Sequence, residues 1–301
     1  MSVEVPGAAT SEAAWMEPLV LRVRHQTRFI YQGPTQDSFN EARLQPVTDH
    51  AQECREFALR IEPDAVVRDY PDFFANCVHY FDVAPPHESL SVDAVSVIQT
   101  RPDARGEPPS ANPPLALKNT EIVESWFEFL QDSVFVSMEP EIWREARDAV
   151  PGGVTDLWRD ARAIGAHVFR SFSYTPNLTT VNTHPLEVLR MRKGVCQDFA
   201  HVMLGMCRSL GIPARYVSGY FFNPKRAPGE IEASHAWVEV FLPGYGWKGF
   251  DPTHDRVPDT RYVKIATGRD YGDIRPVSGT FRGRGTREMI VEVQVSRLDP
   301  A

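Results

Sequence analysis

The segment GVCQDFAHVMLGMCRSLG, residues 194–211, predicts a buried helix that begins at a cysteine. Its large apolar residues recur at i, i+3, i+4, i+7 and i+11, the spacing that places side chains on one face of an α-helix. The residues on that face are Phe199, Val202, Met203, Met206 and Leu210, and those on its flanks are Ala200, Leu204 and Cys207. Because the flanks are apolar as well, most of the helix is expected to be buried. Gly211 and Pro213 end the helix, since glycine favours a left-handed C-cap and proline cannot continue a helix.

Cys196 lies at the N-terminus of this helix, where unpaired N–H groups and the helix dipole stabilise an anion. A thiol in such a position loses its proton more readily, and the thiolate is the nucleophilic form of cysteine. The alternative is a structural cysteine, because cysteines are often buried in protein cores. The choice depends on whether a base and an orienting group occur elsewhere in the chain.

The composition is that of an ordinary globular protein with an acidic balance. The chain has 301 residues, of which 42% are hydrophobic and 24% charged, with a net charge of −8 and a pI near 5.6. This balance argues against nucleic acid and anionic membranes as partners, because both need a basic face. No apolar run is long enough to span a membrane, and no signal peptide is visible at the start. The sequence therefore predicts a cytoplasmic protein whose four cysteines are reduced thiols.

The chain divides into two predicted domains. Residues 1–18 are small and polar, and are expected to form a disordered tail. Residues 19–100 predict an N-terminal β-sandwich-like domain, because they contain several short alternating segments separated by turn residues. Those segments are residues 19–31, 53–61, 76–82 and 88–99. Residues 101–118 are rich in proline and form a predicted linker, and residues 119–298 form the second domain.

The second domain has helices first and strands last, which indicates an α+β fold. Helices are predicted within residues 119–148 and at 155–169, 186–190 and 194–211, and strands at 214–222, 234–241, 247–251 and 288–295. Residues 252–285 are rich in charge and glycine, so we expect them to lie mostly on the surface.

Two residues of one predicted hairpin are candidates for the base and its orienting group. They are His235 in SHAWVEV and Asp251 in GFDPT. If Leu242 pairs with Gly246, Asp251 lies opposite Trp237 and shares a sheet face with His235, within side-chain reach. A register shifted by one residue places the two on opposite faces. The sequence does not choose between these registers, and only the first allows His–Asp contact.

These motifs resemble the transglutaminase-like superfamily. The resemblance is carried by GVCQDFA at 194–200, GIPARYVSGY at 211–220, SHAWVEV at 234–240 and GWKGFDPT at 246–253. It is closest to a bacterial branch of the family with an N-terminal β domain, which YQGPT at 31–35, SFNEARL at 38–44 and PVTD at 46–49 resemble. The resemblance implies a papain-like core, in which a central helix packs on an antiparallel sheet. It also implies a catalytic triad in which Cys196 is the nucleophile, His235 the base and then the acid, and Asp251 the orienting group.

The implied reaction is acyl transfer through a thioester on protein or peptide amides, without a cofactor. The Cys196 N–H is one candidate for the oxyanion donor, and Tyr174 or Gln197 is a candidate for the second. Trp237 is a candidate substrate wall beside His235, although core packing is the alternative role. The triad supports an acyltransferase or amidohydrolase, and a cysteine peptidase of the same fold remains an alternative. A non-catalytic peptide-binding scaffold is the other class, and the sequence reveals neither the substrate nor the oligomeric state.

Other polar residues near these motifs have simpler expected roles. His201 is expected to be a core or surface histidine, and Asp198 a first-turn acid that can also bond a loop. His254 and Asp255 raise the question of a metal site, but no paired ligand spacing supports one, so a solvated loop is predicted. The arginine-rich residues 282–287 are expected to form a solvated turn.

Overall fold

The computed structural model describes residues 17–109, 124–226, 234–283 and 287–298, so the predicted tail at 1–16 and part of the predicted linker lie outside the described residues. The N-terminal strands are β1 (Leu19–Ala42), β2 (Gln52–Glu62), β3 (Arg68–Pro71), β4 (Cys77–Val83) and β5 (His87–Thr100). The helices that follow are η3 (Phe127–Phe129), α2 (Pro140–Ala149), α3 (Leu157–Ser171), α4 (Pro185–Met191) and α5 (Cys196–Ser209), with the short strands β6 (Ser173–Tyr174) and β7 (Lys193–Gly194) between them. The last strands are β8 (Ala214–Phe221), β9 (His235–Leu242), β10 (Gly246–Phe250), β11 (Tyr262–Gly268), β12 (Val277–Arg282) and β13 (Arg287–Leu298). The fold is α+β, as predicted.

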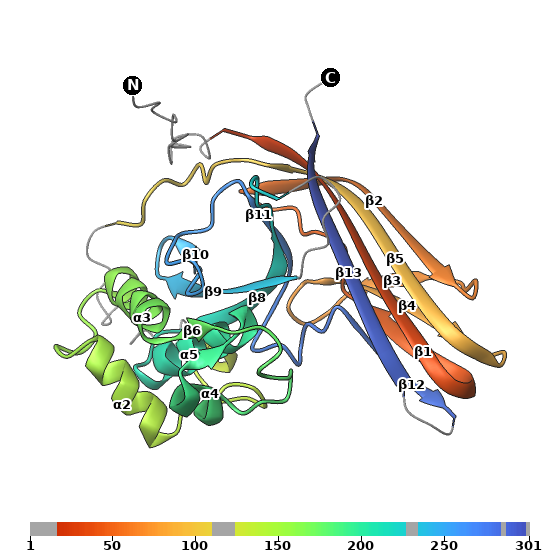
Figure 1. The fold of residues 1–301 in the computed structure, drawn as a ribbon. Helices are drawn as coiled ribbons and strands as arrows, with labels where there is room; N and C mark the ends of the chain where they lie inside the picture. The colour runs from red at the N-terminus through yellow and green to blue at the C-terminus, as the bar shows by residue number, and fades with distance from the viewer. Residues whose placement is uncertain (1–16, 110–123, 227–233, 284–286, 299–301) are drawn as a thin grey trace, which may run out of the picture.

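The N-terminal region is built around β1, which is 24 residues long. Its first half pairs with β5 and β13, and its second half pairs with β4 and β12. The change of partners follows Gly33, whose φ of +113° suits glycine, and the register with β5 shifts between Ile30 and Thr35. Figure 1 shows β1 turning back there, so that the two halves lie in facing layers of strands. Apolar side chains such as Phe29, Phe81 and Leu90 fill the space inside.

The two C-terminal strands depart from the predicted domain division. We assigned residues up to 298 to the second domain, but β12 and β13 pair with β1 of the N-terminal region. The alternation of residues 288–295 predicted a strand correctly. Alternation specifies which face of a strand is buried and carries no information about which sheet the strand joins. The chain therefore leaves the N-terminal region, forms the core, and returns to complete the first sheet (Figure 1).

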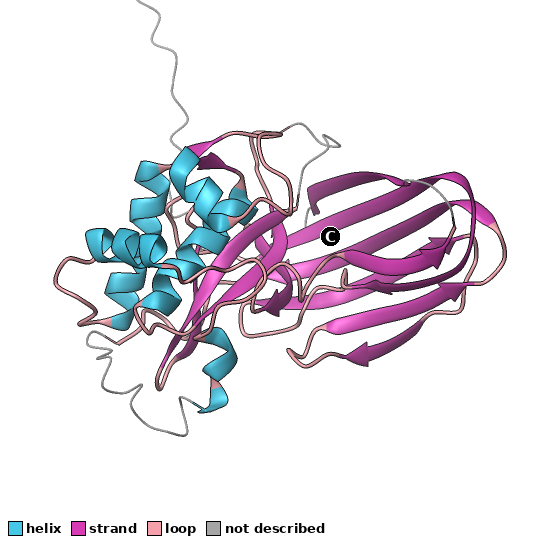
Figure 2. Cartoon of the chain, turned by 90° about the horizontal axis from the view of Figure 1, so that it is seen from below, coloured by secondary structure: helices cyan, strands magenta, loops and turns pink. Residues whose placement is uncertain are grey.

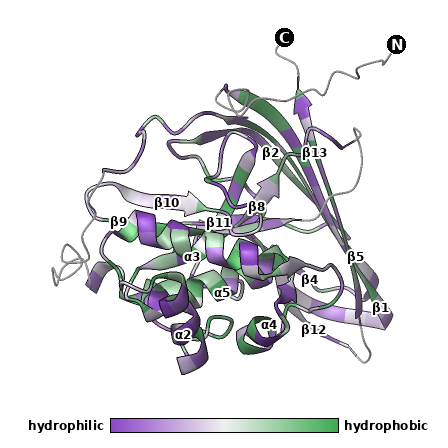
Figure 3. Ribbon diagram, turned by 60° about the vertical axis from the view of Figure 1, so that its left-hand side comes forward, coloured by the Kyte–Doolittle hydropathy of each residue, from purple (hydrophilic) through white to green (hydrophobic). Residues whose placement is uncertain are grey.

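The core places α5 against an antiparallel sheet of order β10-β9-β8-β11. The face of β9 that carries Ala236, Val238 and Val240 packs into the same hydrophobic cluster as α5. The helices α2, α3 and α4 contact α5, so that it is enclosed by helices and sheet. Figure 2 shows the helices gathered at one end of the molecule and the long strands at the other. In Figure 3 the outer helix α2 is largely hydrophilic, whereas α5 is pale to green.

Two predicted segments of the second domain are wrong in detail. Within the described part of residues 119–148, the helix predicted to start at Glu139-Pro140 is α2, whereas the chain before it forms the short η3 with turns and loops in place of a longer helix. Residues 252–285 contain the buried strand β11, where Val263 and Ala266 are fully buried, although we expected mostly surface. Polar residues around this strand make it look exposed in the sequence, but β8 on one side and the N-terminal region cover it.

The N-terminal region and the core share one hydrophobic cluster. Leu21, Val23 and Ile98 of the long strands belong to the cluster that contains α5 and the core sheet. A buried hydrogen bond of 2.8 Å joins His25 Nδ1 to the Tyr220 hydroxyl across this boundary. Within the described residues, no helix has both the length and the apolar character that a membrane span needs.

Candidate active site

Cys196 is the first residue of α5, with Val195 as the N-cap. The turn before the helix is held by the buried Asp198, whose Oδ2 accepts hydrogen bonds from Val195 N at 2.8 Å and from the Thr179 hydroxyl at 2.6 Å. Gly194 allows this arrangement, because a Cβ there would lie 2.6 Å from the same carboxylate oxygen. Asp198 thus ties loop 175–183 to the helix start, as one of its predicted roles required.

His235 and Asp251 are brought together by the strand register. Leu242 pairs with Gly246, and Phe250 pairs with Val238, which is the register that allows the contact. His235 Nε2 lies 2.7 Å from Asp251 Oδ2. His235 is 8% exposed and Asp251 is fully buried, so this pair is largely shielded from water. Of the two registers that the sequence allows, the structure has the one that permits the His–Asp contact, and the contact is made.

The third side chain of the group is Cys196. Its sulfur acts on the neighbouring His235 ring and raises the pKa of the imidazole, and because Nε2 faces Asp251, Nδ1 is the ring nitrogen left for the sulfur. The sulfur also lies 3.9 Å from the Ser234 carbonyl oxygen. The N-terminus of the buried helix and the start of β9 thus place sulfur, imidazole and carboxylate in a row.

The electrostatics of the group favour an ion pair. Burial by itself lowers the pKa of His235, but the Asp251 carboxylate and the Cys196 sulfur outweigh it and raise that pKa to about 10. Burial likewise raises the pKa of Asp251, but the imidazoles of His235 and His254 hold it well below its usual range. The imidazole is therefore protonated and the carboxylate ionised at neutral pH.

Asp251 has three further hydrogen-bond partners that the sequence patterns do not predict. His254 Nδ1 and the Tyr262 hydroxyl each lie 2.7 Å from the same Oδ2 atom, and Thr253 N donates to Oδ1 at 2.8 Å. Residues 252–255 form a turn with Asp255 exposed, as predicted, but the His254 ring also packs on Phe221 and bonds the carboxylate. The short spacing in Asp-Pro-Thr-His is a sequence feature that could have indicated contact between His254 and Asp251. Tyr262 lies on β11, and no sequence feature indicates its contact with Asp251.

The remaining candidate site residues lie in three different settings. Tyr174 is 52% exposed and pairs with Gly194, two residues before Cys196, and burial is the main cause that raises the pKa of its phenol. The Gln197 amide donates to the Val181 carbonyl at 3.4 Å. Trp237 is 2% exposed and its ring stacks near that of His235, with centroids 6.1 Å apart. Trp237 therefore packs in the interior, and its role as a substrate wall stays a prediction.

Backbone donors at the helix start remain available. Within the part of the chain that the structure describes, no backbone acceptor contacts the Cys196 N–H. This N–H is a suitable donor to an oxyanion beside the sulfur. The roles of Tyr174 and Gln197, the two candidates for the second donor, stay predictions.

Three ligand-type residues lie close enough to raise the metal question again. The candidate ligand atoms of His235, Asp251 and His254 all lie within 4.8 Å of one another. Hydrogen bonds account for this arrangement, since each imidazole contacts the same carboxylate oxygen at 2.7 Å. Asp255, which we considered with them, is not in this group.

The other cysteines and the helix histidine lie apart from the triad. Cys207 is fully buried in α5, and burial raises its pKa to about 12. Cys54 and Cys77 are half-buried in the N-terminal sheet, and all four cysteines are free. His201 is buried beside Phe135 and Tyr216, and accepts the Tyr271 N–H, which fits its expected core role.

Comparison with known proteins agrees with this geometry. A family profile described as the transglutaminase-like superfamily matches residues 145–252, which include Cys196, His235 and Asp251. A second, described as the bacterial transglutaminase-like N-terminal region, matches residues 21–99. The chain belongs to the transglutaminase-like superfamily.

Relatives of this transglutaminase-like protein include both uncharacterized and named members. An uncharacterized protein of Mycobacterium leprae is 34% identical over 295 residues, which cover 92% of this chain and 99% of the relative. A protein-glutamine gamma-glutamyltransferase of Pseudomonas aeruginosa is 28% identical over 159 residues, or 46% of this chain and 23% of the relative. A candidate cysteine protease of Cytophaga hutchinsonii has a similar fold, with a TM-score of 0.73 at 22% identity over 95% of this chain and 92% of that one.

Proposed function

We propose that this protein is a cysteine enzyme that acts on protein or peptide amides through a thioester on Cys196. The observation that carries the proposal is the position of His235, whose Nε2 lies 2.7 Å from Asp251, while the Cys196 sulfur lies 3.9 Å from the carbonyl oxygen of the preceding residue, Ser234. A nucleophile, a base and an orienting acid within reach of one another are the parts that acyl transfer by cysteine needs.

The first half of the reaction forms the thioester. The Cys196 thiolate attacks the amide carbonyl carbon, and the resulting oxyanion takes a hydrogen bond from the Cys196 N–H. The tetrahedral intermediate collapses as the C–N bond breaks, and the His235 imidazolium gives its proton to the departing nitrogen. If the substrate is the side-chain amide of glutamine, the nitrogen leaves as ammonia. If it is a peptide bond, the leaving amine is a new amino terminus. Asp251 stays ionised and holds the imidazole in place.

The second half releases the acyl group. His235, now neutral, takes a proton from an incoming primary amine or water as that molecule attacks the thioester carbon. The C–S bond then breaks and the sulfur leaves as the thiolate, which restores the imidazolium–thiolate pair. An amine acceptor gives cross-linking, and water gives deamidation or hydrolysis. Glutamine amide transfer agrees with the name of the Pseudomonas relative, and peptide hydrolysis agrees with the protease name of the Cytophaga protein.

Alkylation tests the nucleophile without knowledge of the substrate. The full chain is treated with iodoacetamide at pH 6, where an ordinary thiol with a pKa of about 8.5 is protonated, and modified cysteines are located by mass spectrometry. We expect Cys196 to react first, and His235→Ala to remove this preference. Buried Cys207 and half-buried Cys54 serve as internal controls. Equal, slow labelling of the accessible thiols would favour the peptide-binding scaffold instead.

A second assay separates the reaction outcomes. The protein is incubated with a glutamine-rich protein and a fluorescent primary amine, and ammonia, incorporated amine and new amino termini are measured. Amine incorporation with ammonia indicates transfer, ammonia alone indicates deamidation, and new termini indicate peptide hydrolysis. We expect Cys196→Ser to abolish whichever product forms, and Asp251→Asn to lower its rate by roughly 10²–10⁴-fold.

A further inference from the structure

A cavity of about 410 Å³ lies behind the triad, between the N-terminal region and the outer face of the core sheet. Its floor is formed by β9 and β10, and its walls are formed by segments 49–52, 101–107 and 257–264. The volume is within the range typical of small-molecule sites. Two lining residues also support the triad, because Trp237 stacks near His235 and Tyr262 bonds Asp251. The cavity is thus adjacent to the active site and separated from it by these two rings.

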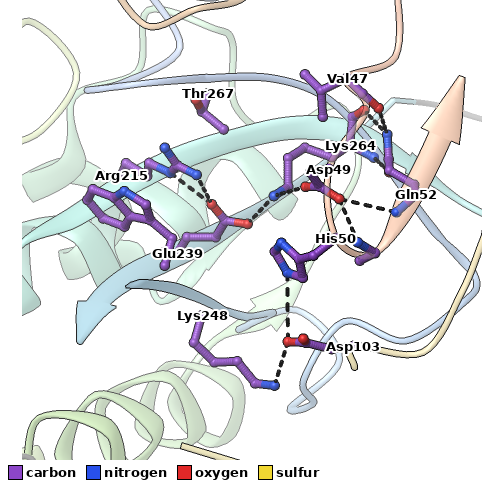
Figure 4. Close-up of polar contacts among 12 residues, drawn as sticks. Val47, Asp49, His50, Gln52, Asp103, Arg215, Glu239, Lys248, Lys264 and Thr267 are labelled. Carbon is purple, nitrogen blue, oxygen red and sulfur yellow. Dashed lines mark hydrogen bonds and ion pairs between the residues drawn. The ribbon is translucent and has the colours of Figure 1, made fainter. Parts of the chain in front are cut away.

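The buried and half-buried charged groups in this cavity are already paired, whereas Arg101 and Glu107 of its lining are exposed. Lys264 Nζ lies 2.6 Å from Glu239 Oε1 and 2.9 Å from Asp49 Oδ2, and Figure 4 shows it bridging the two carboxylates. Lys248 Nζ lies 3.1 Å from Asp103 Oδ2, toward which His50 also points (Figure 4). A charged ligand would find no uncompensated buried charge among these described residues and would lose its hydration. The interior therefore favours an uncharged ligand.

One hydrogen-bond donor at the cavity has no protein partner. Within the described residues, the indole N–H of Trp237 makes no hydrogen bond to the protein, and its ring lines the cavity. This nitrogen lies at the edge of the cavity formed by Gly249 and Pro258, since a Cβ on Gly249 would be 3.5 Å from it. A carbonyl oxygen bound in the cavity would accept this N–H, and a hydrogen bond of this kind contributes about 0.5–1.5 kcal/mol. The rings of Tyr262 and Pro258 beside it provide apolar walls.

We propose that this cavity binds a small, uncharged, planar amide, whose carbonyl oxygen accepts the Trp237 N–H. The site is distinct from the thioester site at Cys196, and the proposal does not depend on catalysis. A ligand bound here contacts the two residues that hold His235 and Asp251 in place.

Binding is tested by titrating the full chain with benzamide, benzoate and benzylamine, which share a ring and differ in charge. Isothermal titration calorimetry measures affinity, and NMR follows the six tryptophan indole N–H signals. The protein is first alkylated at Cys196, so that the thioester site is blocked. We expect saturable binding of benzamide, several-fold weaker binding of the two ions, and movement of the Trp237 indole signal, which is assigned by its loss in Trp237→Phe.

Variants locate the ligand. We expect Trp237→Phe to weaken benzamide binding about 2- to 10-fold through loss of one hydrogen bond. Ala51→Phe fills the cavity and should abolish binding, whereas Ala104→Phe, on an exposed turn outside the lining, should leave it unchanged. Absence of saturable binding, equal binding by Ala51→Phe, or tighter binding of benzoate or benzylamine would each overturn the proposal. Failure of the alkylation assay at Cys196 would instead affect only the proposed catalytic function.

Discussion

At the scale of single residues, Asp251 Oδ2 is the centre of the polar network behind the nucleophile. It accepts three contacts of 2.7 Å, from His235, His254 and Tyr262. Donors around a carboxylate stabilise its charged form, so Asp251 stays ionised while fully buried. The three donors compete for the negative charge of the Asp251 carboxylate. The strength of the His235–Asp251 contact therefore depends on His254 and Tyr262.

Tyr262→Phe removes one of these donors without changing the ring. We expect the pKa of His235 to rise above its value of about 10, because the carboxylate then gives more of its charge to the imidazole. NMR titration of the His235 ring measures this shift. Tyr70→Phe, which breaks an exposed tyrosine–carboxylate contact with Glu41, is the matched control and should leave His235 unchanged. An unchanged or lower pKa in Tyr262→Phe would contradict the role assigned to the hydroxyl.

The raised pKa of His235 also makes a prediction about stability. A folded-state pKa of about 10, against 6.5 in the unfolded chain, means that the folded protein binds the proton more tightly. The resulting contribution of His235 to the free energy of unfolding is fully present below pH 6.5 and is lost as pH rises toward 10. Urea unfolding of wild type and His235→Gln at pH 6, 8 and 10 measures it. We expect the wild-type advantage to shrink with pH, and a constant difference would refute the linkage.

The residues of the triad could be named from the sequence, but their supporting partners could not. Cys196, His235 and Asp251 lie in short motifs with recognisable neighbours. Tyr262 is eleven positions beyond Asp251 on a different strand, and nothing in the sequence around it indicates a contact with a carboxylate. His254 is close in sequence, but only the turn after β10 aims its ring at Asp251.

At the scale of secondary structure, α5 depends on close approach by the chain around it. A Cβ on Gly205 would lie 2.3 Å from the Ser137 carbonyl oxygen and 3.1 Å from Ile142 Cγ2. The segment before α2 therefore crosses α5 at a glycine, where no side chain stands between the two backbones. This crossing helps to hold the helix that presents Cys196.

Gly205→Ala tests whether close packing outweighs helix propensity. Alanine is favoured over glycine inside a helix by about 1 kcal/mol, but the clash with a backbone carbonyl should cost about 1–3 kcal/mol or more. We expect a net loss of stability, measured as a lower Tm. Gly152→Ala is the control, because a Cβ there meets nothing within 4 Å. An increase in Tm for Gly205→Ala would show that the segment before α2 can move away.

The types of most elements could be predicted, whereas their partners could not. Periodicity predicted α5 and the strands that become β8, β9 and β10, because each has one clearly apolar face. The apolar residues before α2 predict a longer helix than the structure has, and two of them, Trp126 and Phe129, pack with Trp247 in an aromatic cluster. Contacts between distant segments decided that conformation, and a local pattern contains no information about them.

At the scale of the whole molecule, buried ion pairs join the N-terminal region to the core. Arg215, Glu239, Lys264 and Asp49 form a continuous chain of contacts, with Arg215 and Lys264 each 2.6 Å from Glu239 (Figure 4). Burial raises the pKa of Glu239, but the two cations outweigh it and lower that pKa to about 2. The chain of ion pairs lies beside the cavity behind the triad, so it also fixes the walls of that cavity.

Lys264→Met should destabilise the protein, because it leaves Glu239 buried with one cation in place of two. We expect a loss of about 3–5 kcal/mol at pH 7, measured by urea unfolding. Since the folded pKa of Glu239 is depressed from 4.5 to about 2, its contribution is present above pH 4.5 and is lost as pH falls toward 2.

The difference between wild type and Lys264→Met should therefore narrow below pH 4.5. Arg60→Met, which removes an exposed pair with Glu62, is the control and should change stability by less than about 1 kcal/mol. A Lys264→Met protein as stable as the control would show that the buried ion pairs contribute little to the joining of the two parts.

The sequence by itself determined the α+β class, the buried helix behind Cys196, and the identity of the three triad residues, because these depend on periodicity and on short motifs. The tertiary structure decided the register that joins His235 to Asp251, the return of β12 and β13 to the first sheet, and the cavity behind Trp237. The physical reason is range. Helix and strand patterns arise from neighbours a few residues apart, whereas register, sheet membership and cavities arise from contacts between segments far apart in the chain.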